Sequence, residues 1–430
     1  MKFKIFNFLK EIFPINRSLT GQGNRDTLKL IKNHIPLKIK SVKSGYKAYD
    51  WIVPKEWKIK DAYVKDQKGH KVIDFKDNNL HLVGYSTAIN KTVSKKELKE
   101  HLYSIEDKPN AIPYITSYYE DKWGFCIKHE DLKKLNDDSY QVYIDSTHKN
   151  GYLDYGELVI PGKSKKEILL STYICHPSMG NNECSGIAVT TFLAKWLLKL
   201  KNRKYTYRIL FLPETLGPIV YLSKHLKKMK KNTIAGFVIT CVGDNLNYSF
   251  LESRKGNTLC DRVARHVLDN FTKSYNSYSY LQRGSDERQY CHPLVDLPVC
   301  SIMRSKYGTY SEYHTSLDNL DFVSAEGLNG SFDILKKCIV LLEKNLIYKN
   351  KIICEPKLKD RGIHPKNWEK RHTGNNKKMR QKVLDIVNVI SYTDGSNTVL
   401  DICEKININF EDCIDYLKIL QKQGIIKLKK

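Results

Sequence analysis

Residues 167–200 read EILLSTYICHPSMGNNECSGIAVTTFLAKWLLKL: a mainly apolar run, a short polar loop and a second apolar stretch. The first run is short and rich in β-favouring residues, which is typical of a buried strand. From Cys184 onward the apolar residues recur at helical spacing and predict an amphipathic helix. His176 and Glu183 fall in the loop between them. The stretch therefore indicates an α/β fold with polar side chains at the end of a strand.

The same alternation of strand and helix continues along the chain. Further strands are predicted at 207–213, 234–242 and 297–304, and further helices near 219–228, 259–270 and 325–346. Strands that alternate with helices imply a mostly parallel sheet covered by helices on both faces. His176, Glu214 and Asp244 each follow a predicted strand, at the edge where parallel sheets bind ligands. We therefore expect a site at this edge.

The composition limits the cellular compartments and the classes of binding partner that are compatible with the sequence. The 72 basic and 47 acidic residues give a net charge of +25, but the lysines are spread along the whole chain. This spread argues against a nucleic-acid stripe on the main body, although anionic partners remain open. Eleven cysteines without a CxxC pair favour a reducing compartment. With no signal-peptide pattern and no apolar run of membrane-spanning length, we expect a cytoplasmic protein without a membrane partner.

Changes in composition and in the spacing of apolar residues along the chain predict three domains. Residues 1–45 and 129–350 form the α/β domain, residues 46–128 form an inserted β-rich domain, and residues 375–430 contain three helices and a strand typical of a winged helix-turn-helix. The winged helix could contact DNA. Because it follows an enzyme-like α/β domain, we expect it instead to act as a lid or as a subunit contact in a homo-oligomer. Among the aromatic residues of the insertion, we expect Tyr118, Tyr119 and Trp123 to pack at a domain interface; a sugar platform is the alternative.

The sequence also predicts two local features, a hairpin and a set of helix caps. The segments YQVYIDST and GYLDYGELVI flank HKNG, which predicts a β-hairpin that turns at Asn150 and Gly151. Near the N-terminus, Arg17, Thr20 and Asn24 are candidate caps for the helix that follows them.

Four motifs carry the chemistry, and they occur in a fixed order. They are CHPSMGNNECSG at 175–186, FLPETLGPI at 211–219, GSDERQYCHP at 284–293 and EYHTSLDNLDFVS at 312–324. Together they resemble the M28-type zinc aminopeptidases. More closely, they resemble a bacterial branch of uncharacterised aminopeptidase-like proteins with an inserted β domain and a C-terminal winged helix, often found among polysaccharide-biosynthesis functions. The resemblance implies a three-layer α/β/α sandwich with a mostly parallel sheet.

The resemblance also implies roles for individual residues. In ordinary members of that fold, two zinc ions share a bridging aspartate, each ion has one histidine ligand, and a glutamate acts as general base. His176 and His314 match the two ligand histidines, and Glu214 matches the base. The other ligand positions depart from the pattern: the bridging aspartate falls on Asn182 and the ligand glutamate on Thr215. The remaining ligand aspartate falls near Thr240, with Asp244 four residues on.

Two interpretations of the site follow. In the first, one zinc ion is held by His176, Glu183 and His314, which leaves a position open for water; Asn182 and Asp244 would support it or help to hold a second ion. In the second, the site has lost its metal and binds a ligand by hydrogen bonds.

The function that follows is metal-dependent hydrolysis of an amide bond. Glu214 would take the proton of a metal-bound water, although it could instead only cap the following helix. The substrate would be a peptide N-terminus or an amide-bearing small molecule or sugar. Asp286, Arg288 and Tyr313, from the third and fourth motifs, are the candidate substrate-binding residues. The alternative is a catalytically inactive ligand sensor with a DNA-binding winged helix.

Overall fold

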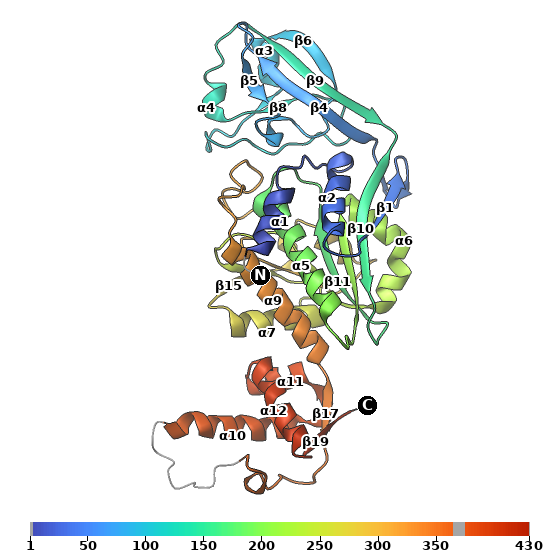
Figure 1. Ribbon diagram of the computed structural model, residues 1–430, viewed down its shortest axis with the longest axis vertical. Helices are drawn as coiled ribbons and strands as arrows, with labels where there is room; N and C mark the ends of the chain where they lie inside the picture. The colour runs from blue at the N-terminus through green and yellow to red at the C-terminus, as the bar shows by residue number, and fades with distance from the viewer. Residues whose placement is uncertain (1–2, 364–374, 430) are drawn as a thin grey trace. The chain divides into compact units, whose positions relative to one another are not determined.

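A computed structural model describes residues 3–363 and 375–429 of the protein, apart from the side chains of residues 375–379 (Figure 1). The contacts divide the chain into two units. Unit 1 comprises Met1–Asp261 and Ser274–Asp333, and unit 2 comprises Arg262–Lys273 and Ile334–Lys430. Among the described residues, no helix combines the length and the apolar character needed to cross a membrane.

The core of unit 1 is an eight-stranded sheet. Its strands, from one edge to the other, are β1 (Lys38–Lys43), β10 (Tyr152–Ile160), β12 (Thr206–Leu212), β11 (Glu167–Tyr173), β13 (Thr233–Val238), β16 (Val299–Met303), β14 (Tyr248–Leu251) and β15 (Tyr275–Tyr278). The central strands β12, β11, β13 and β16 are parallel. Antiparallel strands flank them on both sides.

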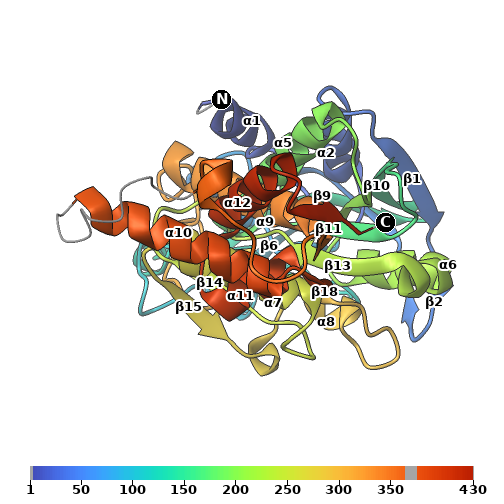
Figure 2. The ribbon, with the colours of Figure 1, turned by 90° about the horizontal axis from the view of Figure 1, so that it is seen from below.

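Burial explains why the central strands read as continuous apolar runs. All seven residues of β11 are buried, as expected for a strand covered on both faces. The helices of this fold are α1 (Lys4–Ile12), α2 (Gln22–Lys32), α5 (Ser185–Lys199), α6 (Leu216–Asn232), α7 (Leu259–Phe271), α8 (Glu287–Tyr290) and α9 (Ala325–Lys344). Figure 2 shows α1, α2 and α5 gathered along one side of the strands. In α5, a Cβ on Gly186 would lie 2.4 Å from the carbonyl oxygen of Ile239, so only glycine permits this close packing.

The inserted region forms a second sheet that extends beyond the predicted range of 46–128. It contains β5 (Lys71–Asp74), β4 (Glu56–Lys65), β9 (Ser139–Lys149) and β6 (Ile89–Ser94), in that order. Shorter elements accompany it: β2 (Lys47–Ala48), β3 (Trp51–Ile52), β7 (Leu102–Tyr103), β8 (Phe125–Cys126), α3 (Lys95–Glu100), α4 (His129–Leu132) and the 3-10 turn Asn79–His81. The buried Trp57 and Tyr85 stack with ring centroids 5.6 Å apart in its core.

The predicted hairpin at residues 140–160 is wrong. Both strands exist, but β9 pairs with β4 and β6, whereas β10 pairs with β1 and β12. The chain thus crosses from one sheet to the other at Asn150 and Gly151. Gly151 is needed for close packing, since a Cβ there would lie 2.5 Å from the Cβ of Glu56. Alternation identifies a strand, but it does not identify the strand's partner.

The predicted caps of the second helix are also wrong. The N-cap of α2 is Gly21, and no side chain caps it. Thr20 instead bonds the hydroxyl of Tyr85, and Asn24 Nδ2 donates to the carbonyl of Ser18 at 2.7 Å. Arg17 is buried and reaches a carboxylate far along the chain.

Unit 2 contains the expected C-terminal elements. They are β17 (Ile347–Asn350), the 3-10 turn Lys359–Arg361, α10 (Asn375–Tyr392), β18 (Asp394–Thr398), α11 (Val399–Ile406), α12 (Phe410–Lys422) and β19 (Ile426–Leu428). The three strands pair in the order β18-β17-β19. Thr398 and Asp401 form a capping box at the start of α11, which fixes where that helix begins.

The first turn of α12 is packed within its own unit. The ring of Phe410 lies 5.5 Å from that of Phe271, and Glu411 pairs with Lys337 Nζ at 2.5 Å. In DNA-binding helix-turn-helix proteins the first turn of this helix reads base edges, where a carboxylate would repel the phosphates. In this chain that turn packs against residues of α7 and α9 that belong to the same unit.

Phe410→Ala should destabilise unit 2 selectively. Truncating this buried ring removes its transfer free energy and leaves a cavity, so the free energy of unfolding should fall by about 3 kcal/mol. Hydrogen exchange of the amides of α11 and α12 under mild urea measures the loss. Tyr416→Ala, at a half-exposed position on α12, is the matched control and should cost about 1 kcal/mol or less. Equal protection factors in the two variants would contradict the prediction.

Candidate functional site

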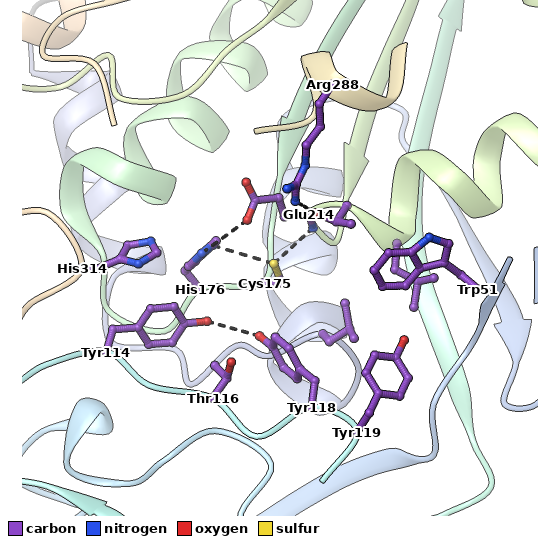
Figure 3. Close-up of a pocket in the computed structure, with 13 residues that line it drawn as sticks. Trp51, Tyr114, Thr116, Tyr118, Tyr119, Cys175, His176, Glu214, Arg288 and His314 are labelled. Carbon is purple, nitrogen blue, oxygen red and sulfur yellow. Dashed lines mark hydrogen bonds and ion pairs between the residues drawn. The ribbon is translucent and has the colours of Figure 1, made fainter. Parts of the chain in front are cut away.

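The carboxyl edge of the central strands opens into a cavity of about 320 Å³. Thirteen residues line it: Leu19, Trp51, Tyr114, Thr116, Tyr118, Tyr119, Cys175, His176, Glu214, Thr215, Leu216, Arg288 and His314. Figure 3 shows His176, Glu214 and Arg288 facing the tyrosines of the inserted region across this space. The cavity therefore combines the loops after β11 and β12 with the inserted region.

His176 is held in place by the buried carboxylate of Glu183. Nδ1 of His176 lies 2.8 Å from Glu183 Oε2, and the backbone N–H groups of Cys175 and His176 donate to the same oxygen. Burial alone would lower the pKa of His176, but the hydrogen bond and charge of Glu183 outweigh it and raise the pKa above 6.5. This arrangement directs Nε2 toward the cavity.

Arg17 completes the environment of Glu183. Its Nε donates to Glu183 Oε1 at 2.8 Å and to the carbonyl of His176 at 3.0 Å, and both side chains of the ion pair are fully buried. Burial would raise the pKa of Glu183, yet His176 and Arg17 together hold it below its usual value. Arg17 Nη1 also donates to the carbonyl of Ile12 at 2.6 Å. One guanidinium thus ties the end of α1 to the loop that carries His176.

Glu214 faces His176 across the site. Its Oε2 lies 3.7 Å from His176 Nε2, and its Oε1 accepts a hydrogen bond from Ser285 Oγ at 3.0 Å. About a fifth of its side chain, 22%, is exposed, so water can reach the carboxylate. Burial raises the pKa of Glu214, while the charge of His176 opposes the shift. A carboxylate with a raised pKa in a cavity is suited to proton transfer.

A strained turn at Thr215 holds the Glu214 side chain in position. The N–H of Leu216 donates to the carbonyl of Glu214 at 2.6 Å, and Thr215 between them has φ 62° and ψ −68°. These angles describe a classic γ-turn, which is rare and unfavourable for a β-branched residue. Asp286 Oδ1 accepts from the N–H of Thr215 at 2.8 Å, and Arg288 Nη2 donates to its Oγ1 at 2.5 Å. Strain that neighbouring side chains maintain in this way is characteristic of functional sites.

His314 also has a left-handed backbone, with φ 54°. The N–H of Tyr114 donates to its carbonyl at 2.9 Å, so the inserted region fixes this loop. The rings of His314 and His176 have centroids 5.4 Å apart, and the buried Nε2 of His314 has no hydrogen-bond partner among the described residues. Burial and the charge of His176 lower the pKa of His314 to about 3. The ring is therefore neutral and keeps an unpaired lone pair.

The residues at the substituted ligand positions are bonded to protein. Asn182 Oδ1 accepts from the hydroxyl of Tyr173 at 3.0 Å, and Thr240 Oγ1 lies 2.6 Å from that hydroxyl. Asp244 accepts hydrogen bonds from Asn181 Nδ2 and Ser305 N–H, and it does not line the cavity. Neutral side chains stand at these two positions, 182 and 240, in place of carboxylates, and the buried Asn182 Nδ2 has no hydrogen-bond partner among the described residues.

The other predicted residues divide into two groups. Arg288 lines the cavity, as do Tyr118 and Tyr119. Asp286 is buried behind the strained turn, Tyr313 stacks on His314 with centroids 3.9 Å apart, and Trp123 stacks on His101; these three do not line the cavity. Glu183, predicted as a metal ligand, has both oxygens engaged by protein donors. Its role as a ligand stays a prediction, and its contacts favour a positioning role.

Three residues of the site escaped sequence reasoning. Arg17 has no local signal, because its partner lies 166 positions along the chain. Trp51 and Tyr114 belong to the aromatic-rich inserted region, whose composition was the only signal that could have pointed to them.

Comparisons with known proteins identify the family of the chain. The family described as "Domain of unknown function (DUF4910)" matches residues 6–345, and a family described as "winged helix-turn-helix" matches residues 346–428. The chain belongs to the DUF4910 family. It is 45% identical over 426 residues to a Clostridium acetobutylicum protein named "Putative polysaccharide biosynthesis protein with aminopeptidase-like domain", covering 99% of this chain and 96% of that one.

Two solved structures place the fold of this DUF4910 chain. The crystal structure of a putative peptidase from Clostridium acetobutylicum matches with a TM-score of 0.92 and 42% identity, covering 100% of this chain and 96% of that one. BSAP, a zinc aminopeptidase from Bacillus subtilis, matches with a TM-score of 0.57 and 14% identity, covering 79% and 94%. The predicted aminopeptidase-like α/β fold with a C-terminal winged helix is confirmed.

Arg17→Met should be strongly destabilising. It leaves the Glu183 carboxylate buried without a cation, which typically costs about 3–5 kcal/mol. Chemical denaturation of unit 1 measures the loss. Arg25→Met is the matched control: Arg25 pairs with Glu56 and Asp154 with 27% of its side chain exposed, so the loss should be smaller.

The double variant Arg17→Met, Glu183→Gln tests the origin of this cost. Because it removes both charges, it should lose clearly less stability than the sum of the two single variants. Additive losses would show that the two side chains act independently.

Proposed function

We propose that this DUF4910 protein is a peptidase-type hydrolase that cleaves an amide bond in the cavity at the sheet edge. The observation that carries the proposal is the Glu214 carboxylate, partly exposed, 3.7 Å from His176 Nε2 and raised in pKa by burial. The similarity of fold to a zinc aminopeptidase supports the reaction type. The substrate is a peptide or an amide-bearing small molecule or sugar.

In this proposal Glu214 is the general base. Its carboxylate accepts the proton of the attacking water and later returns it to the leaving nitrogen. Ser285 and the γ-turn at Thr215 hold the carboxylate in position. His176, oriented by Glu183, lies beside the carboxylate of the base, and the neutral His314 lies next to His176 with ring centroids 5.4 Å apart.

A single zinc ion fits the donors that remain. His176 Nε2 and the unpaired Nε2 of His314 would hold it, with Glu183 accepting the Nδ1–H of His176, as carboxylates commonly do behind ligand histidines. When bound, the ion would polarise the substrate carbonyl and lower the pKa of a bound water. In this arrangement Glu183 positions a ligand and does not itself bind the ion.

The winged helix is assigned a supporting role. The ion pair of Glu411 with Lys337 and the buried Phe410 occupy the turn that would read DNA. We therefore favour the hydrolase over a DNA-binding ligand sensor. Either function could operate in a homo-oligomer.

Glu214→Gln should abolish turnover while the fold persists. The amide keeps the shape of the side chain but cannot accept a proton, so the rate on any cleaved amide should fall by roughly 100-fold or more. Screening a panel of aminoacyl and N-acyl amides for released amine provides the assay. Glu130→Gln, at the exposed surface on α4, is the control. Wild-type turnover by Glu214→Gln would remove this residue from the mechanism.

The pH profile gives a second test of Glu214. The base works only when ionised, so turnover should fall as the pH drops through its pKa. Because burial raises that pKa, the acidic limb should lie above pH 4.5. A limb at or below this value would argue that Glu214 is not the titrating base.

Metal content tests the zinc site independently of activity. Protein purified without chelator should bind no more than one zinc ion per chain, and His176→Ala or His314→Ala should abolish binding, because each removes one of two nitrogen ligands. Elemental analysis measures the stoichiometry, with His292→Ala, at an exposed position, as the control. Two tightly bound ions per chain would contradict this site.

A further inference from the structure

The charges around the cavity select among amide substrates. Of its thirteen lining residues, only Glu214 carries a carboxylate, and Arg288 carries a permanent positive charge. The others are aromatic, apolar, hydroxyl-bearing, thiol or imidazole side chains. A substrate with a free α-amine brings a positive charge, which needs an acidic partner when it is buried.

The nearby acids are not available to such an amine. Glu183 is saturated by Arg17, His176 and two backbone N–H groups. Asp286 is buried behind Thr215. A free amine would therefore have to pair with Glu214, the group that the proposed chemistry requires as a base. The donor set disfavours the substrates that define aminopeptidases.

Arg288 favours a substrate that carries a negative charge. Its guanidinium is exposed at the cavity, and among the described residues it donates one hydrogen bond, from Nη2 to Thr215 Oγ1. A guanidinium has five N–H donors, so most of the fork is free to bind an anion. Carboxylates match this fork in geometry and charge.

The inserted region supplies an aromatic wall of two exposed rings. Trp51 is 39% exposed and Tyr119 is 60% exposed; their ring centroids lie 6.4 Å apart and their planes are tilted by 58°. Behind them, the hydroxyls of Tyr114 and Tyr118 lie 3.2 Å apart and present polar atoms to the cavity (Figure 3). An exposed aromatic pair beside hydroxyl groups suits a ligand with both C–H faces and hydroxyl groups, which a pyranose ring has.

We infer that the cavity binds an acidic N-acyl sugar: a pyranose that packs in the angle between Trp51 and Tyr119, carries a carboxylate for Arg288 and presents an N-acyl amide to Glu214. The reaction assigned to that amide rests on the proposed function, whereas the binding preference does not. The name of the 45% identical relative, which includes polysaccharide biosynthesis, agrees with this ligand class.

Calorimetric titration of the Glu214→Gln protein tests the preference without turnover. The probes are N-acetylglucosaminuronic acid, N-acetylglucosamine, which lacks only the carboxylate, and leucinamide, which carries a free amine. We expect the acidic sugar to bind at least about tenfold more tightly than the neutral sugar, as charge-assisted hydrogen bonds add of the order of 1–2 kcal/mol. Leucinamide, titrated into the wild-type protein so that Glu214 is present, should bind more weakly than the acidic sugar.

Variants assign the preference to residues. Arg288→Met should remove the advantage of the acidic sugar while the neutral sugar still binds, which also shows that the cavity is folded. Thr215→Val removes the hydrogen bond to Arg288 but keeps its charge, so the advantage should remain. Arg283→Met, at an exposed arginine outside the cavity, is the remote control. Trp51→Ala should weaken both sugars.

Several results would overturn the inference: equal affinity for the two sugars, tighter binding of leucinamide, or no binding of the acidic sugar up to about 10 mM. Sugar selectivity without any Glu214-dependent amide cleavage would reject the proposed function and leave the inference standing. Glu214-dependent cleavage of leucinamide without sugar binding would do the reverse.

Discussion

The site depends on one buried carboxylate. Glu183 gathers Arg17, the Nδ1 of His176 and two backbone N–H groups, and the cost of burying this charge is offset only while all of these donors are in place. The carboxylate thereby fixes the loop after β11, the end of α1 and the orientation of the imidazole together. The carboxylate anchors His176, and its own role as an ion ligand stays a prediction.

Several loops around this carboxylate have a strained backbone. Ser178, Thr215, Cys241 and His314 all have positive φ without being glycine, and all lie in loops at the carboxyl edge of the sheet. Such angles persist only where the surroundings enforce them. At Thr215 the enforcing groups are Asp286 and Arg288, so residues first considered for substrate binding also shape the turn that presents Glu214.

Periodicity predicted most of the fold because burial acts locally on each element: β11 and α5 follow directly from their apolar patterns. Partnership between distant segments has no such local signal. The pattern therefore predicts the wrong partner for β9, and it predicts a helix cap at Arg17, which instead pairs with Glu183. In the site, the motifs located His176, Glu214, Arg288 and His314, but not the orientation of Glu183, which depends on donors from two segments far apart in the sequence.

The inserted region leaves and rejoins the main sheet at neighbouring positions. Lys43 of β1 is paired with Tyr152 of β10, and the N–H of Ser44 donates to the carbonyl of Gly151 at 2.9 Å. A segment with adjacent ends can be lengthened, shortened or exchanged in evolution without changing the register of the strands it joins. The main sheet and Glu214 would be inherited unchanged, while the aromatic residues of the inserted region diversified. Related chains could thus acquire new ligands by recombination at a single seam.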